Sequence, residues 1–218
     1  MEIKHIFIHG WSFDKNIWKD YFNIKNALFL DLPSHGENRE YQSLQDFSLQ
    51  IANIINSQKE KVNLIGWSIG ATVSFLTALQ TENIDKLILI GFSPKFNDIN
   101  LGSNPKFIKA FLINLQKDFE NTIYNFRKNA TSDEFRDIKL PEKEGSIKLL
   151  KDFINIDLTE KFLNKKAFII HGKDDIIVNP YATLFCKNII KEPVIYLTNS
   201  NHAPFLENKD LIKDLIVE

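Results

Sequence analysis

Cysteine is almost absent from this sequence of 218 residues, since Cys186 is the only one. A single cysteine excludes an intrachain disulfide framework and is typical of proteins from a reducing compartment. The sequence also opens without the charged, apolar and small-residue segments of a secretory signal. We therefore expect a cytoplasmic protein.

An excess of charge of one sign is lacking as well. The 27 Lys and Arg residues nearly balance the 28 Asp and Glu residues, which leaves a net charge of -1. Binding to nucleic acid or anionic lipid through overall charge requires a clear basic excess. No apolar run approaches the roughly 20 residues of a membrane-spanning helix. We expect neither a nucleic-acid partner nor a membrane.

The sequence is instead rich in short apolar runs that alternate with stretches of helical spacing, such as residues 44–55. The runs are too short for buried helices and do not alternate strictly, which is typical of strands covered on both faces of a parallel sheet. The alternation predicts an α/β fold, with a mostly parallel sheet of about six strands and helices on both faces. The expected strands cover residues 3–8, 27–30, 62–65, 87–90, 167–170 and 194–197.

One stretch, residues 95–162, interrupts this alternation because it contains only helical patterns. We interpret it as a helical cap inserted between two strands. A chain of this length is most simply a single domain, so we expect one domain over residues 1–218 that includes the cap. The apolar residues near one face of the cap are Phe107, Phe111, Leu115, Phe119, Ile123 and Phe126.

A Gly-x-Ser-x-Gly motif occupies residues 66–70, between an expected strand and an expected helix. This arrangement predicts a nucleophile elbow, a tight turn in which small residues flank the serine and allow the helix to pack on the strand. The turn exposes the serine hydroxyl above the amino-terminal end of the helix, where negative charge is stabilised. Ser68 is therefore the candidate nucleophile.

A reactive serine needs a base, and the base needs an acid that orients it. His202 follows the last expected strand and is the candidate base, while Asp175 follows the preceding strand and is the favoured acid. The order Ser, Asp, His is that of α/β-hydrolases. Asp174 remains a weaker alternative for the acid and is otherwise expected to cap the turn. For Asp31 we favour a role in structuring its loop.

Acyl transfer also needs two hydrogen-bond donors for the oxyanion of its tetrahedral intermediate. The backbone N–H of Ile69, directly after the nucleophile, is one candidate, and that of Trp11, in the loop after the first strand, is the other. Trp11 is also a candidate wall of the acyl site. Cys186 lies in an expected helix over residues 181–190, so we interpret it as a core residue and not as a nucleophile.

Taken in order, residues 9–10, 31–36, 66–70, 172–178 and His202 resemble the α/β-hydrolase superfamily over nearly the whole chain. Within it, residues 9–11, 66–68 and 202–205 are most similar to the pimeloyl-acyl carrier protein methyl ester esterases of biotin synthesis. The resemblance implies a Ser68, His202 and Asp175 triad with the amides of Trp11 and Ile69 as oxyanion donors. That family has two additional strands before the first one here, which again gives about six strands.

The resemblance further implies a cap whose phenylalanine lines the acyl channel and whose basic residues meet an acidic carrier protein. Phe126 falls where that phenylalanine is expected. The candidates for carrier contact are Lys106, Lys109, Lys117, Arg127 and Lys128, although a solvated helical face explains these charges equally well.

The sequence thus predicts a serine esterase that needs no metal or organic cofactor, since no ligand-spaced cluster or phosphate loop occurs. The expected substrate is an acyl ester, either a small molecule or bound to a carrier protein, with a methyl pimeloyl ester as the specific expectation. The alternatives are a thioesterase, a short-chain carboxylesterase, a carbon-carbon bond hydrolase, or a catalytically silent binding module with the same fold.

Overall fold

The computed structural model describes residues 2–217. Its centre is a six-stranded sheet in which every neighbouring pair is parallel, in the order β2-β1-β3-β4-β5-β6. The predicted parallel sheet of six strands is confirmed. The strands are β1 (His5–Ile8), β2 (Ala27–Leu30), β3 (Val62–Trp67), β4 (Ile84–Ile90), β5 (Leu163–Gly172) and β6 (Ile190–Thr198).

Successive strand residues contribute to different sides of the sheet, as the two-residue period of a strand requires. Ile6 and Ile8 of β1 belong to one hydrophobic cluster, and Phe7 between them belongs to the other. All three side chains are completely buried. A strand that is apolar on both faces reads as a continuous run, and this explains why the sequence showed no alternation.

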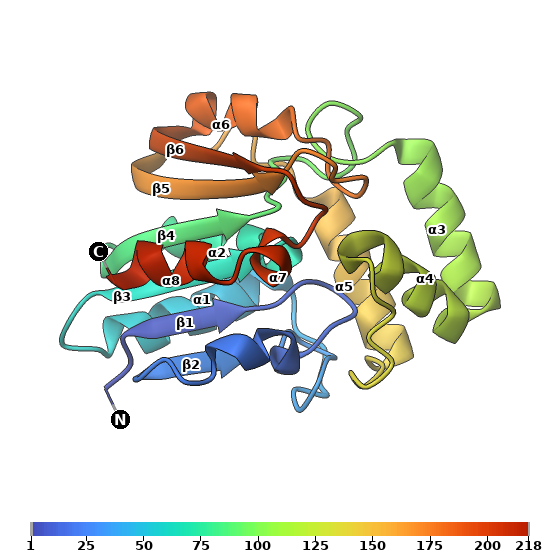
Figure 1. The fold of residues 1–218 in the computed structure, drawn as a ribbon, viewed down its shortest axis with the longest axis horizontal. Coiled ribbons are helices and arrows are strands. Elements are labelled where there is room, and N and C mark those ends of the chain that lie inside the picture. The colour runs from blue at the N-terminus through green and yellow to red at the C-terminus, as the bar shows by residue number, and fades with distance from the viewer. Residues whose placement is uncertain (1, 218) are drawn as a thin grey trace.

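Helices cover both faces of the sheet (Figure 1). The first face packs against α1 (Leu44–Asn56), α2 (Ile69–Ala78) and α6 (Ala182–Ile189). The second packs against the 3-10 helix η1 (Lys15–Tyr21), the short α7 (Pro204–Glu207) and α8 (Asp210–Val217). The fold is thus the α/β-hydrolase fold that the sequence predicted.

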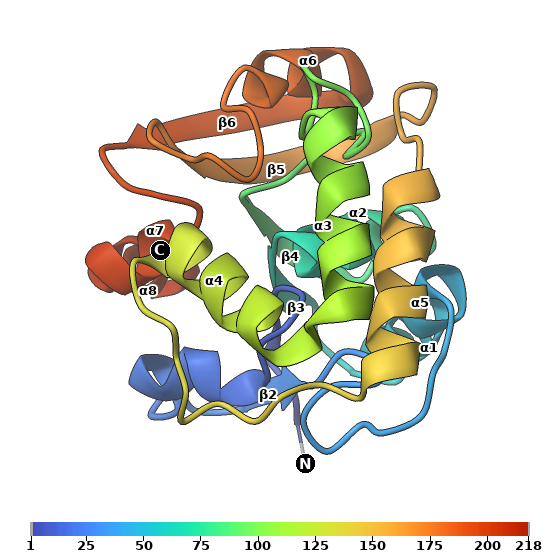
Figure 2. The same cartoon turned by 90° about the vertical axis from the view of Figure 1, so that its right-hand side faces the viewer.

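Three helices lie between β4 and β5 in the chain and extend across the end of the sheet where the strands terminate (Figures 1 and 2). They are α3 (Pro105–Lys117), α4 (Phe119–Thr131) and α5 (Lys143–Asn155). Asp118 separates α3 from α4, because its φ of -147° and ψ of 84° are not helical, and its side chain accepts the N–H of Asn121 to cap α4.

The apolar residues expected along one face of the cap differ in burial. Leu115 of α3 and Ile123 of α4 are buried, whereas Phe107, near the amino-terminal end of α3, is 70% exposed. Within residues 2–217, the helices are all too short or too polar to cross a bilayer.

Candidate active site

The turn at Ser68 joins the end of β3 to the start of α2. Ser68 has φ 58° and ψ -120°, a conformation that non-glycine residues rarely adopt and that is concentrated at functional sites. A Cβ on Gly66 would lie 2.2 Å from the carbonyl oxygen of Gly70, and one on Gly70 would lie 2.4 Å from that of Ile8. The two glycines of the motif are therefore required by the close packing of the turn.

The backbone around Ser68 is held firmly. Its N–H donates to the carbonyl of Ile90 at 2.8 Å, and its own carbonyl accepts the N–H groups of Ala71 and Thr72 as α2 begins. Ile69 is the first residue of α2, where N–H groups have no acceptor within the helix. The positive end of the helix dipole therefore lies beside the serine.

Asp175 and His202 are brought together from two different loops. Oδ2 of Asp175 lies 2.7 Å from Nδ1 of His202, and both side chains are almost completely buried. Oδ1 of the same carboxylate accepts the N–H groups of Ile177 at 2.8 Å and Val178 at 2.9 Å. Burial alone would raise the pKa of Asp175, but His202 and a further hydrogen bond from His171 outweigh burial and hold the pKa well below its usual range.

The imidazole of His202 lies close to the serine turn. A Cβ on Gly91 would lie 2.8 Å from Cε1 of His202, so only glycine leaves room for the ring there. The ring also packs against Trp67, the residue before Ser68, at a centroid distance of 5.7 Å, and the Trp67 indole donates to the His202 carbonyl at 2.8 Å. Nδ1 faces the carboxylate, which leaves Nε2 as the nitrogen that can act as a base.

Nε2 of His202 is buried and has no hydrogen-bond partner among residues 2–217, Ser68 Oγ included. Hydrogen bonds between a catalytic base and its nucleophile are often long before substrate binds. A buried nitrogen without a partner is costly, since an unmade hydrogen bond costs about 1–3 kcal/mol. Within the described residues, Nε2 is thus the ring nitrogen of His202 that is left to bond another group.

His171, at the end of β5, is a functional candidate that sequence reasoning missed. Its Nε2 lies 3.0 Å from Oδ2 of Asp175 and 3.1 Å from the carbonyl of Val178. Both neighbours are acceptors, so the ring proton belongs on Nε2. Asp175 therefore receives hydrogen bonds from two histidines and two backbone amides, which fix its position.

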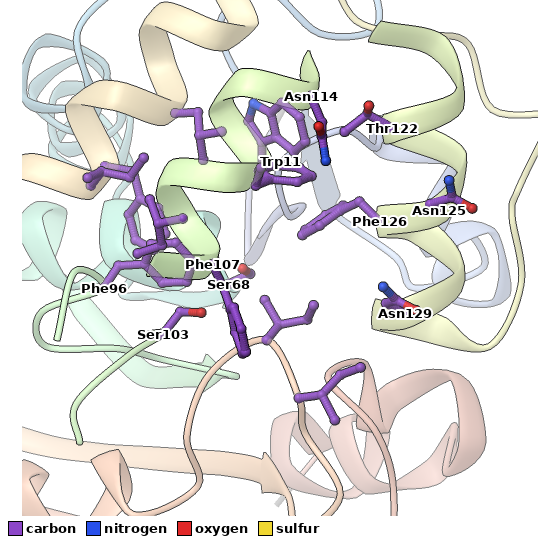
Figure 3. Close-up of a pocket in the computed structure, with 17 residues that line it drawn as sticks. Trp11, Ser68, Phe96, Ser103, Phe107, Asn114, Thr122, Asn125, Phe126 and Asn129 are labelled. Carbon is purple, nitrogen blue, oxygen red and sulfur yellow. The ribbon is translucent and has the colours of Figure 1, made fainter. Parts of the chain in front are cut away.

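A cavity of about 450 Å³ opens beside Ser68, beneath the cap helices (Figure 3). Figure 3 shows Trp11 and Phe126 facing each other at its wall, and their rings make an edge contact at 5.4 Å. Asn114, Thr122, Asn125 and Asn129 supply neutral polar groups, and among residues 2–217 no Lys, Arg, His, Asp or Glu side chain lines the cavity. The cavity therefore suits an uncharged chain with scattered polar atoms.

The other candidates have different surroundings. Asp31 accepts the N–H groups of Lys15 at 2.7 Å and Glu37 at 2.9 Å, which ties its own loop to the first residue of η1. Asp174 is exposed, and the turn that we expected it to cap is capped by Asp175 instead. Cys186 is buried in α6, where burial raises the pKa of its thiol to about 12.

The expected carrier-contact residues separate into two groups. Lys106, Lys109, Lys117 and Lys128 are exposed on α3 and α4. Arg127 is completely buried, so its inclusion in that set was wrong. The charge of Arg127 led to this error, although the residue lies four positions after Ile123 and three before Ala130, on the buried side of α4. Within residues 2–217, no group of three or more His, Cys, Asp or Glu side chains could hold a metal ion.

Curated relatives match the chain over almost its whole length. The pimeloyl-[acyl-carrier protein] methyl ester esterase of Wigglesworthia glossinidia brevipalpis is 29% identical over 97% of this chain and 91% of the relative. The protein of the same name from Vibrio parahaemolyticus is 25% identical over 94% of this chain and 89% of the relative.

Solved structures share the fold at lower identity. An esterase from Exiguobacterium antarcticum has a TM-score of 0.83 at 19% identity, covering 99% of this chain and 91% of that chain. An enol-lactonase from Burkholderia xenovorans has a TM-score of 0.82 at 15% identity, covering 100% and 91%. The model of the alpha/beta hydrolase family matches residues 6–214. The resemblance predicted from the sequence is confirmed, and the chain belongs to the alpha/beta hydrolase family.

Proposed function

We propose that this protein is a serine carboxylesterase that acts through an acyl-enzyme intermediate. The observation that carries the proposal is the buried Asp175–His202 pair, with Nε2 of His202 unpaired beside the strained turn at Ser68. Such a pair supports general-base activation of a serine hydroxyl. The curated relatives named as esterases support the same class of reaction.

In the proposed reaction, Oγ of Ser68 attacks the ester carbonyl carbon while its proton passes to Nε2 of His202. The backbone N–H groups of Trp11 and Ile69 stabilise the oxyanion of the tetrahedral intermediate. His202 then protonates the departing alcohol, which leaves Ser68 acylated. Water attacks the acyl carbon with His202 again as base, and the acid departs as the serine regains its proton.

The specific substrate that we propose is a methyl pimeloyl ester carried by acyl carrier protein in the cytoplasm. The names of the relatives support this choice, and so does the cavity, because a pimeloyl chain that is a methyl ester at one end and a thioester at the other is uncharged throughout. A cavity wall without charge disfavours a free carboxylate, since burying an unpaired charge is costly. Trp11 and Phe126 contact the acyl chain in this proposal.

Labelling with a fluorophosphonate probe tests the reaction class. The wild-type protein should be labelled on Ser68, and the Ser68→Ala variant should not. A wild-type protein that stays unlabelled and hydrolyses no ester would overturn the proposal and favour a silent binding module.

A comparison of dimethyl pimelate with monomethyl pimelate tests the substrate. Both contain the same methyl ester, but the second also carries a carboxylate. We expect kcat/KM at pH 7 to be at least about 10-fold higher for the diester, because the free acid must be desolvated in the cavity. Equal values would show that charge at the far end of the chain is not excluded.

Growth of a biotin auxotroph that lacks this esterase, restored by wild type and not by Ser68→Ala, would place the activity in biotin synthesis.

The carrier protein is the partner that we propose for the exposed lysines. Lys106 and Lys109 flank Phe107, which lines the cavity. Replacing both lysines by glutamate should raise KM for the carrier-bound ester and leave the kinetics with dimethyl pimelate unchanged, since charges on a surface act mainly on association. If KM for the two substrates changes equally, the lysines do not contact the carrier.

A further inference from the structure

Ser12 is the residue after Trp11, and its backbone is gripped from two sides. It is completely buried and has a φ of 72°, in the left-handed region. Its N–H donates to Nε2 of His35 at 3.1 Å. Its carbonyl oxygen accepts one hydrogen bond from Nε of Arg127 at 3.1 Å and a second from Nη2 of the same guanidinium. The side chains of His35 and Arg127 therefore hold Ser12 in a backbone conformation that non-glycine residues rarely adopt.

The preceding peptide, which carries the N–H of Trp11, is fixed as well. Nε2 of His9 accepts the N–H of Leu32 at 3.0 Å, so the proton of this ring lies on Nδ1. Nδ1 then donates to the carbonyl of Gly10 at 2.8 Å. The carbonyl of Gly10 and the N–H of Trp11 belong to one planar peptide and point in opposite directions. Holding the carbonyl thus aims the N–H.

Arg127 is the contribution of the cap to this arrangement. Its guanidinium donates to the carbonyls of Phe135 at 2.7 Å, Ile138 at 2.8 Å and Lys139 at 3.1 Å, in addition to Ser12. Burial lowers the pKa of Arg127 to about 10, which still leaves the side chain charged at neutral pH. A buried cation is costly unless it is fully hydrogen-bonded, and here carbonyl oxygens from two separate segments satisfy it.

The surroundings of Arg127 show that the contact is specific. Its guanidinium carbon lies 5.3 Å from the ring centroid of Phe13, the residue after Ser12, and 5.9 Å from that of Tyr124 in α4. The planar, five-donor group of arginine can bond several carbonyls at once, which an ammonium group cannot do in the same geometry. One side chain therefore links α4, the segment after it and the loop after β1.

We propose that Arg127 is a positioning residue that couples the cap to the oxyanion loop, residues 10–13, by holding the carbonyl of Ser12 and thereby the direction of the Trp11 N–H. The inference rests on the proposed function insofar as Trp11 acts as an oxyanion donor. Arg127 touches neither the substrate nor the reacting atoms. Its effect passes through the backbone of Ser12, so a change in it should alter transition-state stabilisation more than substrate binding.

The test compares Arg127→Met with Lys151→Met. Methionine keeps much of the length and apolar packing of arginine but removes every donor. Lys151 is an exposed residue of α5, so its variant controls for loss of one positive charge from the cap helices. Kinetics with dimethyl pimelate, affinity for a trifluoromethyl ketone analogue that forms the oxyanion, and amide hydrogen exchange of residues 10–13 are measured for both.

For Arg127→Met we expect kcat to fall about 10- to 100-fold, because a misplaced donor loses much of what a removed donor loses. Affinity for the ketone should fall by a similar factor, with KM within about 2-fold of wild type. Exchange of residues 10–13 should accelerate, while exchange in β5 and β6 stays as in wild type. Lys151→Met should match wild type in every measurement. Unchanged exchange of the loop, or a change in KM without a change in kcat, would overturn the proposal.

Arg127→Lys provides the second variant if the methionine variant does not fold. Its single ammonium group keeps the charge but cannot bond all four carbonyls that Arg127 bonds. The exchange rate of residues 10–13 and kcat should therefore lie between the wild-type values and those expected for a loop without these bonds. Wild-type values in both would overturn the proposal. A wild-type protein that hydrolyses no ester and is not labelled by fluorophosphonate would instead refute the proposed function, and the exchange measurement would still decide the role of Arg127.

Discussion

The two halves of the sheet each carry a pair of buried histidines beside one buried aspartate. At the ends of β1 and β2 they are His9, His35 and Asp31, and at the ends of β5 and β6 they are His171, His202 and Asp175. The residue types are the same and the burial is nearly the same. The two clusters differ in what their polar atoms contact.

In the first cluster, backbone groups occupy both nitrogens of both histidines. His9 bonds the carbonyl of Gly10 and the N–H of Leu32, and His35 bonds the carbonyl of Pro33 and the N–H of Ser12. The rings of His9 and His35 therefore hold the neighbouring loops in fixed positions. In the second cluster, Nε2 of His202 has no partner among residues 2–217 while its Nδ1 is bound to a carboxylate. Nδ1 of His171 is also unpaired among these residues, so what distinguishes His202 as the candidate base is a spare nitrogen together with the packing of its ring against Trp67, the residue before Ser68.

Removing the spare nitrogen should have the largest effect. We expect His202→Ala to lower kcat by about 10⁵-fold or more, judging by the loss when a comparable triad loses its histidine. Thermal unfolding followed by circular dichroism should show a folded variant, which separates loss of chemistry from loss of fold. Near-normal turnover of dimethyl pimelate by His202→Ala would show that the unpaired nitrogen of His202 is not needed, and the functional difference between the two clusters would no longer hold.

The two aspartates offer the next test, as a matched pair of Asp→Asn substitutions. Asp175→Asn should lower kcat about 10⁴-fold, because an amide can donate to Nδ1 and favours the wrong tautomer of His202. Asp31→Asn leaves one of two bound backbone amides without its acceptor, so it should destabilise the fold by about 1–3 kcal/mol and lower kcat by less than 10-fold. Urea unfolding and steady-state kinetics measure both. Equal losses of kcat in the two variants would contradict the comparison.

His171 should have a smaller effect on the second cluster, because it acts through Asp175. His171→Phe keeps a ring in the site but removes the donor that lies 3.0 Å from Oδ2 of the carboxylate. The pKa of Asp175 should then rise and kcat at pH 8 should fall about 10-fold, since one hydrogen bond to a charged group contributes about 1.5–3 kcal/mol. Kinetics at pH 8 and urea unfolding measure the two effects separately, and a kcat equal to that of wild type would contradict a role of His171 through Asp175.

Much of the fold could be predicted from the sequence because its signals are local. The strands were visible as apolar runs, and β2 (Ala27–Leu30) has the predicted bounds, while β5 extends from residue 163 to 172 instead of 167 to 170. The additional residues of β5 include Asn164, Lys165 and Lys166, which no apolar pattern could reveal. The turn at Ser68 was visible because its two glycines are required by backbone contacts within a short segment.

Asp175 and His202 were also predicted, and the structure brings them together, but two other parts of the site could not be predicted because their contacts join distant segments. Arg127 bonds Ser12 across 115 positions, and although its spacing from Ile123 places it on the buried side of α4, no local pattern shows which carbonyls its guanidinium bonds. His171 was visible beside Asp175 in the sequence, but its role depends on the turn that directs the carboxylate back toward it. The roles of Arg127 and His171 both depend on the burial of their side chains, and burial is set by the assembled fold.

The effect expected of the first cluster is on stability and not on kcat, and it depends on pH. Burial, together with the neighbouring His9, lowers the pKa of His35 to about 3, from an ordinary value near 6.5. Between these two values the unfolded chain binds a proton at residue 35 and the folded protein does not. Stability should therefore fall as the pH decreases from about 6.5 toward 3, by up to about 1.4 kcal/mol per pH unit from this residue.

His35→Gln removes that titration while keeping one acceptor for the N–H of Ser12 and one donor for the carbonyl of Pro33. The variant should lose about 1–2 kcal/mol of stability at pH 8, because its hydrogen bonds fit less well. Its free energy of unfolding in urea should then change less steeply between pH 6.5 and pH 4.5 than that of wild type. Parallel curves over this range would mean that residue 35 binds protons equally in both states. In that case the folded protein would not keep His35 neutral, and His35 would not have the structural role described for the first cluster.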